Sequence, residues 1–200
     1  MANANTTYQS MTDETLMRQL RERQKDAFHE LYQRYSGRLL RFFFRMLGND
    51  EETAQDFLHD IFLKVIERPA QYNPKQSFST WIFVVAYNMC KNEYRRRNVR
   101  KYVTRVETTL LDEFPQIDGN PQDAETDCVL FHNALLKALE LLSDNHRDVF
   151  LLRFQQQFSI KEISDITGCA EGTIKSRLFH ATRQLADLLH DYNPYHDEGV

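Results

Sequence analysis

Apolar residues recur every three or four positions through most of the first hundred residues, which is the spacing of a helix with one buried face. The first long run stops at Gly48, and the second stops before Pro69, because a proline forbids continuation of a helix. No strand-like alternation of any length interrupts these runs. We therefore predict an all-α bundle whose main helices cover residues 26–47, 50–68 and 79 to about 97, with a loop over residues 69–78.

Helical patterns resume near Asp127 and end in the clearest local motif of the chain, residues 159–185. Ser159, followed three residues later by Glu162, has the form of a capping box, which marks a helix start. Gly168 suits the left-handed stop at the end of that helix. Two short helices joined by a glycine-containing turn predict a helix-turn-helix. The apolar residues of the second helix fall within one narrow arc: Ile174, Leu178, Ala181 and Leu185.

The face of this second helix opposite its apolar stripe is polar, yet it also carries the aromatic residue Phe179. Small hydroxyls, histidine or arginine donors and apolar groups read base edges in the major groove, and flanking cations suit the phosphates. The alternative is that Phe179 covers a neighbouring loop and the rest is plain surface. We predict that Ser176, Phe179 and His180 face bases, while Lys175 and Arg177 hold phosphates. The full predicted DNA-binding set on this helix is Thr173, Lys175, Ser176, Arg177, Phe179, His180 and Arg183.

The helix predicted from Ser79 has a stripe that starts aromatic with Trp81 and ends cationic with Lys91 and Arg95. Such a stripe suits single-stranded nucleic acid, whose bases stack on rings while its backbone follows the charge. The alternative is a core tryptophan on a helix whose C-terminal cations complement the macrodipole. Residues 91–105 include seven cations and one anion, which is more charge than a dipole needs and favours nucleic acid.

This basic block is followed by an acidic one, and the net charge of −4 conceals both. Residues 106–127 contain seven anions and no cation, together with two prolines, one glycine and little periodicity. This composition predicts a flexible linker between two small domains. The linker either mimics nucleic acid in a basic channel or is a solvated spacer. The predicted organisation is a disordered tail (1–12), a first domain (13–105), the linker (106–127), a helix-turn-helix domain (128–190) and a second tail (191–200).

The remaining composition argues against several classes of protein. Cys90, Cys128 and Cys169 are far apart and odd in number, so they predict neither a disulfide framework nor a metal site. No apolar run approaches the roughly 18 residues of a membrane span, and the N-terminus lacks the pattern of a signal peptide. The seven histidines are scattered, and no catalytic triad or carboxylate pair can be nominated. We predict a cytoplasmic protein without membrane insertion, catalytic residues, metal or cofactor.

Four groups of short motifs occur in order along the chain. The first two are Phe28-x-x-Leu31-Tyr32-x-x-Tyr35 and Asp56-Phe-Leu-His-Asp60-Ile-Phe62-Leu-Lys64. The third is Phe78-Ser-Thr-Trp81-Ile82 with Ala86-x-Asn88 and Arg95-Arg96. The fourth is Arg147-x-Val149-Phe150 with Glu162-Ile163 and Gly172-Thr173-Ile174-Lys175-Ser176-Arg177-Leu178. In this order and at this spacing they resemble the sigma-70 family of bacterial RNA polymerase sigma factors, in its small extracytoplasmic-function (ECF) group. The resemblance covers roughly residues 25–105 and 130–188.

The resemblance implies a sigma factor that binds core RNA polymerase, reads the −35 and −10 promoter elements and helps to melt DNA. Core polymerase, through its clamp helices and flap, and promoter DNA are the implied partners, and an anti-sigma factor is a further candidate. An unstacked −10 base is then captured near the loop from Tyr72 to Phe78. The residues implied to contact polymerase are Asp56, His59, Asp60, Phe62 and Lys64. The residues implied in −10 recognition are Tyr72, Lys75, Phe78, Trp81, Asn88, Lys91, Arg95 and Arg96.

Two positions depart from the usual family pattern: His59 stands where glutamine is common, and Asn92 where aspartate is commoner. The third globular domain of housekeeping members is absent, and the acidic linker stands in its place. The rival interpretation is a two-domain transcriptional regulator with a LuxR-like reader, which binds operator DNA without replacing the sigma factor. A sensor domain has no use for the basic block, which argues against that rival. An RNA-binding antiterminator is a weaker alternative.

Overall fold

The computed structural model describes residues 8–105 and 124–192, and every regular element in those ranges is helical. We call helices α2 to α5 the N-terminal unit and helices α6 to α9 the C-terminal unit. The N-terminal unit contains α2 (Asp13–Arg21), α3 (Lys25–Met46), α4 (Glu51–Glu67), the short 3-10 helix η1 (Pro69–Gln71) and α5 (Phe78–Arg105). The C-terminal unit contains α6 (Ala124–Leu141), α7 (Asp144–Phe150), the π-helical turn η2 (Leu151–Gln155), α8 (Ile160–Thr167), α9 (Glu171–Leu188) and the 3-10 helix η3 (His190–Tyr192). The prediction of an all-α fold is confirmed.

The signals that predicted the helix ends act in the structure as expected. Asp50 is the N-cap of α4, and its Oδ1 accepts a hydrogen bond of 3.0 Å from the backbone N–H of Thr53. Gly48 lies between α3 and α4 with a φ of +74°, a left-handed conformation that glycine adopts without strain. Helix α6 begins at Ala124, so residues 124–127 of the predicted linker are helical. The rest of the predicted linker, and residues 1–7 and 193–200 of the predicted tails, lie outside the described residues.

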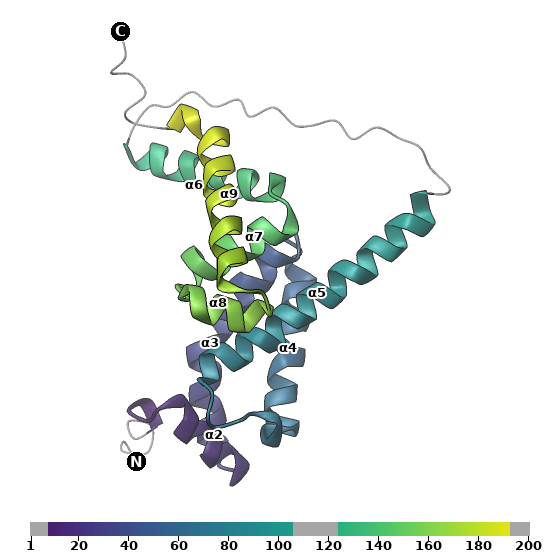
Figure 1. The fold of residues 1–200 in the computed structure, drawn as a ribbon. Helices are drawn as coiled ribbons and strands as arrows, with labels where there is room; N and C mark the ends of the chain where they lie inside the picture. Colours follow the sequence, from purple (N-terminus) through teal and green to yellow (C-terminus); the bar gives the residue numbers. More distant parts are fainter. Residues whose placement is uncertain (1–7, 106–123, 193–200) are drawn as a thin grey trace.

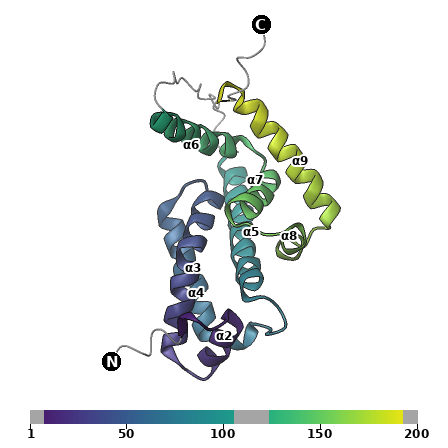
Figure 2. The same ribbon diagram turned by 90° about the vertical axis from the view of Figure 1, so that its left-hand side faces the viewer.

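Helix α5 lies between the other helices of the N-terminal unit and the C-terminal unit. Helices α3 and α4 run alongside each other on one side of α5, while α7 and α8 lie on the other side (Figure 2). Helix α2 lies across the end of the N-terminal unit, near the start of α5. The last turns of α5 project beyond the neighbouring helices, and α9 lies on the outer side of the C-terminal unit (Figures 1 and 2).

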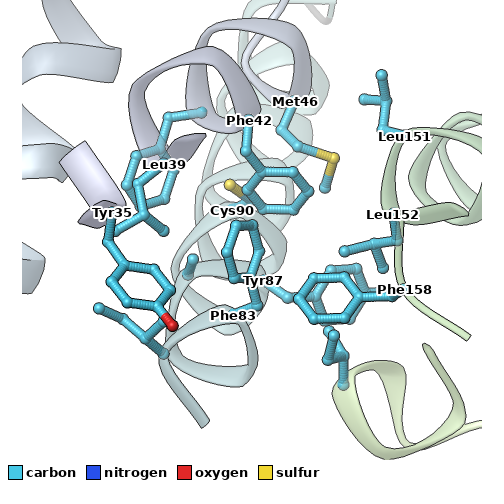
Figure 3. Packing of buried hydrophobic residues seen from close by; sticks show 14 of the residues in the cluster. Tyr35, Leu39, Phe42, Met46, Phe83, Tyr87, Cys90, Leu151, Leu152 and Phe158 are labelled. Carbon is cyan, nitrogen blue, oxygen red and sulfur yellow. The ribbon is translucent and has the colours of Figure 1, made fainter. Parts of the chain in front are cut away.

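One hydrophobic core continues from α3 through α5 into the C-terminal unit (Figure 3). The Phe83 ring of α5 packs edge-on against Phe42 of α3, with centroids 5.3 Å apart, and against Phe158 of the C-terminal unit, at 5.0 Å. Tyr87 and Cys90 of α5 are buried beside it. The sequence pattern had indicated a single core side of α5. The helix is in fact buried on two sides, because the second side packs against the C-terminal unit.

Within the described residues, no helix combines the length and the apolar character that crossing a membrane requires.

Candidate nucleic-acid and polymerase interfaces

The helix-turn-helix has the local geometry that its sequence predicts. Ser159 and Glu162 form a reciprocal capping box: the Ser159 Oγ accepts from the Glu162 N–H at 3.2 Å, and the Ser159 N–H donates to Glu162 Oε2 at 2.8 Å. Gly168 ends α8 with a φ of +69°. The Ser164 hydroxyl then donates to the Cys169 carbonyl at 2.6 Å, which fixes the turn into α9.

Helix α9 presents the predicted polar face to solvent. Ile174, Ala181 and Leu185 are buried, and Phe179 on the opposite side is 61% exposed. The alternative in which Phe179 covers a loop does not fit this exposure, because its described ring contact is with the neighbouring His180, at 5.5 Å. The other exposed members of the predicted set are Thr173, Lys175, Ser176, His180 and Arg183.

Two members of that set also take part in packing. The Arg177 side chain is half-buried, and its Nη1 lies 3.3 Å from the Sγ of Cys169 in the turn before α9. The His180 ring stacks on His146 of α7, with centroids 6.0 Å apart. Burial lowers the pKa of His146, and electrostatic repulsion from His180 and Arg177 lowers it further. Arg177 and His180 therefore lie where the exposed face of α9 meets α7.

The aromatic residues predicted for −10 recognition form a small cluster at the start of α5. The Tyr72 ring lies 5.6 Å from Phe78 and 5.4 Å from Trp81. Tyr72 is 1% exposed and Phe78 0% exposed, so their rings support the loop and are not accessible to a nucleobase in this structure. Trp81 is half-buried, while Lys75 and Asn88 are exposed.

Helix α8 covers the side of α5 on which Trp81 lies. Trp81 and Val84 line a shared hollow with three charged residues of α8, Lys161, Glu162 and Asp165. Sequence periodicity does not predict this contact, because it reports which face of a helix is apolar and not which element covers that face. In this structure a single strand of DNA could not reach the full predicted stripe.

Lys91, the first cation of the stripe, is already paired. Its Nζ lies 3.5 Å from Oδ2 of Asp148 in α7, a carboxylate that is 1% exposed. The Oδ1 of Asp148 is buried and has no hydrogen-bond partner among the described residues. Burial raises the pKa of Asp148 to about 6, although Lys91 and Arg147 oppose the rise. Beside this pair, Arg147 Nη2 donates to the Tyr94 hydroxyl at 3.0 Å.

Part of the basic block has a structural role. Arg97 donates to the Leu47 carbonyl and to Asp50 Oδ2, each at 3.0 Å, and so stabilises the corner between α3 and α4. Both Arg97 and Arg96 pair with the buried Glu93, at 3.0 and 2.6 Å. Arg96 is still largely exposed, as is Arg95. The charge available for nucleic acid is therefore smaller than the sequence count suggests.

Two of the predicted polymerase contacts, His59 and Phe62, line a hollow between α3 and α4. Phe62 is 3% exposed and forms part of its floor, packed against Tyr32 at a centroid distance of 4.7 Å. Tyr32, Leu63 and Ile66 are large apolar residues that remain 41%, 38% and 46% exposed. Sequence reasoning included neither Leu63 nor Ile66 among the predicted polymerase contacts. The available signal was an apolar stripe on α4 wider than one core face. Asp56, His59, Asp60 and Lys64 are exposed on the same helix.

In the part of the chain that the structure describes, no three histidine, cysteine, aspartate or glutamate side chains gather in a way that could hold a metal ion.

Comparisons with known proteins agree over both units. Residues 31–100 match the family model described as Sigma-70 region 2, and residues 132–185 match the one described as Sigma-70, region 4. The chain is 30% identical over 185 residues to the ECF RNA polymerase sigma factor BldN of Streptomyces coelicolor, covering 90% of this chain and 68% of that protein. It is 29% identical over 174 residues to the RNA polymerase sigma factor CarQ of Myxococcus xanthus, covering 86% and 95%. The fold is similar to that of the sigma factor RpoE of Bartonella quintana in its co-crystal with the anti-sigma factor NepR. That similarity has a TM-score of 0.63 at 22% identity, over 82% of this chain and 96% of that one.

Proposed function

The chain belongs to the ECF group of the sigma-70 family of RNA polymerase sigma factors, and we propose that it reads its promoters with α9 at the −35 element and with the start of α5 at the −10 element. It is a specificity subunit that directs initiation and not an enzyme. The rival reading as a LuxR-like regulator is not favoured, because the N-terminal unit matches sigma region 2 and not a sensor domain.

The observation that carries the −35 assignment is the exposed face of α9. Phe179, 61% exposed, lies beside exposed hydroxyl, imidazole and cationic groups on a helix whose other side is anchored in a core. An exposed phenylalanine ring on its own contributes no stability to the helix. In the major groove, the methyl group of thymine offers the ring an apolar partner. The phosphates on either side are then held by Lys175 and Arg177.

At the −10 element, the proposal is that one base leaves the stack and is captured near the loop from Tyr72 to Phe78. Removing a base from the stack costs a few kcal/mol, which stacking and pocket contacts must offset. Trp81 supplies the stacking surface, and Lys75 and Asn88 are exposed beside it. The buried rings of Tyr72 and Phe78 hold Trp81 in place. Lys91, Arg95 and Arg96 follow the backbone further along α5.

For polymerase, we assign the hollow between α3 and α4 to the clamp helices and the C-terminal unit to the flap. Exposed apolar groups next to the carboxylates of Asp56 and Asp60 fit an interface with an apolar centre and a charged rim. The Bartonella quintana relative was crystallised with an anti-sigma factor, and we extend that class of partner to this chain. Since polymerase and promoters are cytoplasmic, we place the protein in the cytoplasm.

The test is reconstituted transcription. Purified core polymerase is incubated with a promoter library, with and without the full chain, and the transcribed templates are sequenced. Transcripts that require the chain and share two conserved elements are the expected result. The free chain is expected to bind promoter duplex only weakly, because its two reading faces lie on separate units. Nanomolar, sequence-specific binding by the free chain, without any new transcripts, would favour the regulator instead.

A further inference from the structure

The loop between α4 and α5, residues 68–77, is held by a side chain of α2. Arg21 donates from Nε to the carbonyl of Pro69 at 3.1 Å and from Nη2 to the carbonyl of Tyr72. The planar guanidinium can bond two carbonyls at once in a fixed relative geometry. Arg21 therefore fixes the first half of the 68–77 loop.

A second side chain of α2 fixes the other end of the same loop. Glu14 Oε1 accepts a hydrogen bond of 3.2 Å from the backbone N–H of Phe78, the first residue of α5. The first N–H groups of a helix lack intrahelical partners, and a carboxylate satisfies one of them while complementing the dipole. Both ends of the 68–77 loop are thus bound to one short helix.

Helix α2 is itself anchored to α3. Arg34 of α3 pairs with Asp13 Oδ1 at 2.7 Å and donates to the carbonyl of Met11 at 2.9 Å. The hydroxyl of the buried Tyr35 donates to the other oxygen of Asp13. Burial raises the pKa of Tyr35, and the hydrogen bond to Asp13 raises it further, so this hydroxyl stays protonated. Through these contacts, α2 links the position of the 68–77 loop to the core of the N-terminal unit.

The held loop contributes Tyr72 to the aromatic cluster, and Phe78 and Trp81 follow at the start of α5. Tyr72, whose carbonyl binds Arg21, donates from its hydroxyl to the Gln76 carbonyl at 2.6 Å and packs its ring against Phe78 and Trp81. Phe78, whose N–H binds Glu14, lies 5.6 Å from the Trp81 ring. A displacement of either backbone contact would move the surface on which a base is proposed to stack.

We propose that Arg21 and Glu14 are positioning residues for −10 recognition, which hold the 68–77 loop in the shape that captures an unstacked base. This inference rests on the function proposed above. Helix α2 lies before residue 31, where the match to sigma region 2 begins, so nothing in that match assigns it a role. Capture depends on geometry to within about 1 Å, so a loop that is present but displaced loses selectivity.

Two simpler roles for Arg21 make different predictions. As an exposed cation it could bind a phosphate, and its loss would then weaken all sequences alike and lower the salt slope by about one charge. If Arg21 is purely structural, its replacement would lower the amount of folded protein without changing which promoters are selected. A positioning role instead predicts that base preference is lost at the −10 element and kept at the −35 element. Measuring base preference at both elements therefore distinguishes positioning from the other two roles.

The experiment uses holoenzyme assembled with the full chain and a template library randomised at both elements. The variants are Arg21→Gln, Arg21→Lys, Glu14→Ala and Glu14→Gln. Arg18→Gln is the matched control, because Arg18 is exposed on the same helix and its described side-chain hydrogen bond, of 3.5 Å, is to Thr15 within that helix and not to the loop.

We expect Arg21→Gln and Glu14→Ala to reduce base preference in the −10 element about tenfold, while preference in the −35 element stays as in the wild type. Arg21→Lys and Glu14→Gln each keep one hydrogen-bonding group and should retain part of the preference. Unchanged −10 preference in both Arg21→Gln and Glu14→Ala would overturn the inference, as would equal loss at both elements. If wild-type holoenzyme itself selects no promoter, the proposed function has failed and not the positioning role.

Discussion

Helices α9 and α5 both carry a polar face proposed to touch promoter DNA, but the face of α9 is open whereas that of α5 is partly covered. Phe179 on α9 is 61% exposed, whereas Trp81 on α5 is half-buried and lies beside α8. Lys91 on α5 is held by a carboxylate of the other unit. The difference lies in the packing between units and not in the helices themselves. It follows that α8 has to leave α5 before both faces can bind one promoter.

Separation of the units opens the shared hydrophobic core and breaks individual contacts across it. The ring contact between Phe158 and Phe83 is lost. The hydrogen bonds that Arg38 donates to the side chain and the carbonyl of Gln156, at 3.3 and 3.2 Å, are lost as well. Exposing a phenylalanine that is 4% accessible costs about 1.5–3 kcal/mol. Hydration of the Asp148 carboxylate opposes that cost, because a buried charge regains its solvent.

The largest expected effect comes from Phe158→Ala, which removes the ring between the units. Truncating a buried phenylalanine costs about 3–5 kcal/mol, and here much of that cost falls on the contact with α5. We expect the units to separate, which small-angle X-ray scattering would register as a larger radius of gyration, and single-stranded −10 DNA to bind the free chain more tightly.

Leu141→Ala is the matched control, because Leu141 is 45% exposed and its loss should change neither quantity. Circular dichroism distinguishes separation from unfolding of the C-terminal unit. A folded Phe158→Ala chain with unchanged dimensions would mean that Phe158 does not hold the units together.

The next effect is a pH dependence from Asp148. Its pKa in the structure, about 6, lies above that of a hydrated aspartate, so its contribution to stability is greatest at low pH and is lost as pH rises through about 6. At neutral pH the raised pKa lowers the free energy of unfolding by roughly 2–3 kcal/mol. Asp148→Asn should therefore stabilise the chain at pH 7.5 and have little effect at pH 4.5, in urea unfolding at both values.

Asp187→Asn is the control, because Asp187 is an exposed carboxylate of α9 and is not among the groups that face Asp148. His146 also titrates in this range, and because its pKa is lowered in the folded chain, acidification destabilises the chain through His146. Subtracting the free energy of unfolding of the wild type from that of the variant removes this contribution and leaves that of Asp148. A stability difference equal at both pH values would contradict the assignment.

The charged and titratable groups that face Asp148 are Tyr87, Cys90, Lys91 and Tyr94 of α5 and Asp144 and Arg147 of α7.

A third effect concerns the open face alone. Replacement of Ser176, Phe179 or His180 should change base preference in the −35 element and cost about 1–3 kcal/mol for the matching base pair. Phe179→Ala should leave thermal stability almost unchanged, because the ring is exposed. Sequencing of selected templates provides the measurement. A variant that unfolds while keeping its preference would show that the ring acts in packing.

The smallest effect is expected from Lys175→Ala. Lys175 is exposed at the edge of the face, and its loss should weaken binding to all −35 sequences alike. The salt dependence of holoenzyme binding should fall by about one charge, while the preferred sequence stays the same. A changed preferred base would instead make Lys175 a base-reading residue.

Local signals predicted most of the helical structure, and contacts between distant residues explain what they missed. The capping box at Ser159 and the left-handed Gly168 depend on a few neighbouring residues, so the sequence was sufficient. The second buried side of α5 at Phe83 depends on Phe158, in another unit, and no periodicity encodes such a partner.

The same reasoning applies to the candidate site. The sequence identified the exposed face of α9, because one helix determines it. It did not reveal that Tyr72 is buried, because the loop that contains it is held by α2. Nor did it separate Arg97, whose partners lie at the corner of α3 and α4, from cations that remain exposed.

The pairing of Lys91 has a consequence for how the chain responds to ions. If Lys91 binds a promoter phosphate as proposed, its amine exchanges one anion, a buried carboxylate, for another, a phosphate. Added salt weakens phosphate contacts strongly, because releasing counterions from DNA into a more concentrated salt solution gains less free energy, but salt screens a buried pair much less. A rise in ionic strength therefore shifts this exchange toward Asp148 and a closed chain. Through this single amine, the ionic composition around the protein would influence how readily its two units separate.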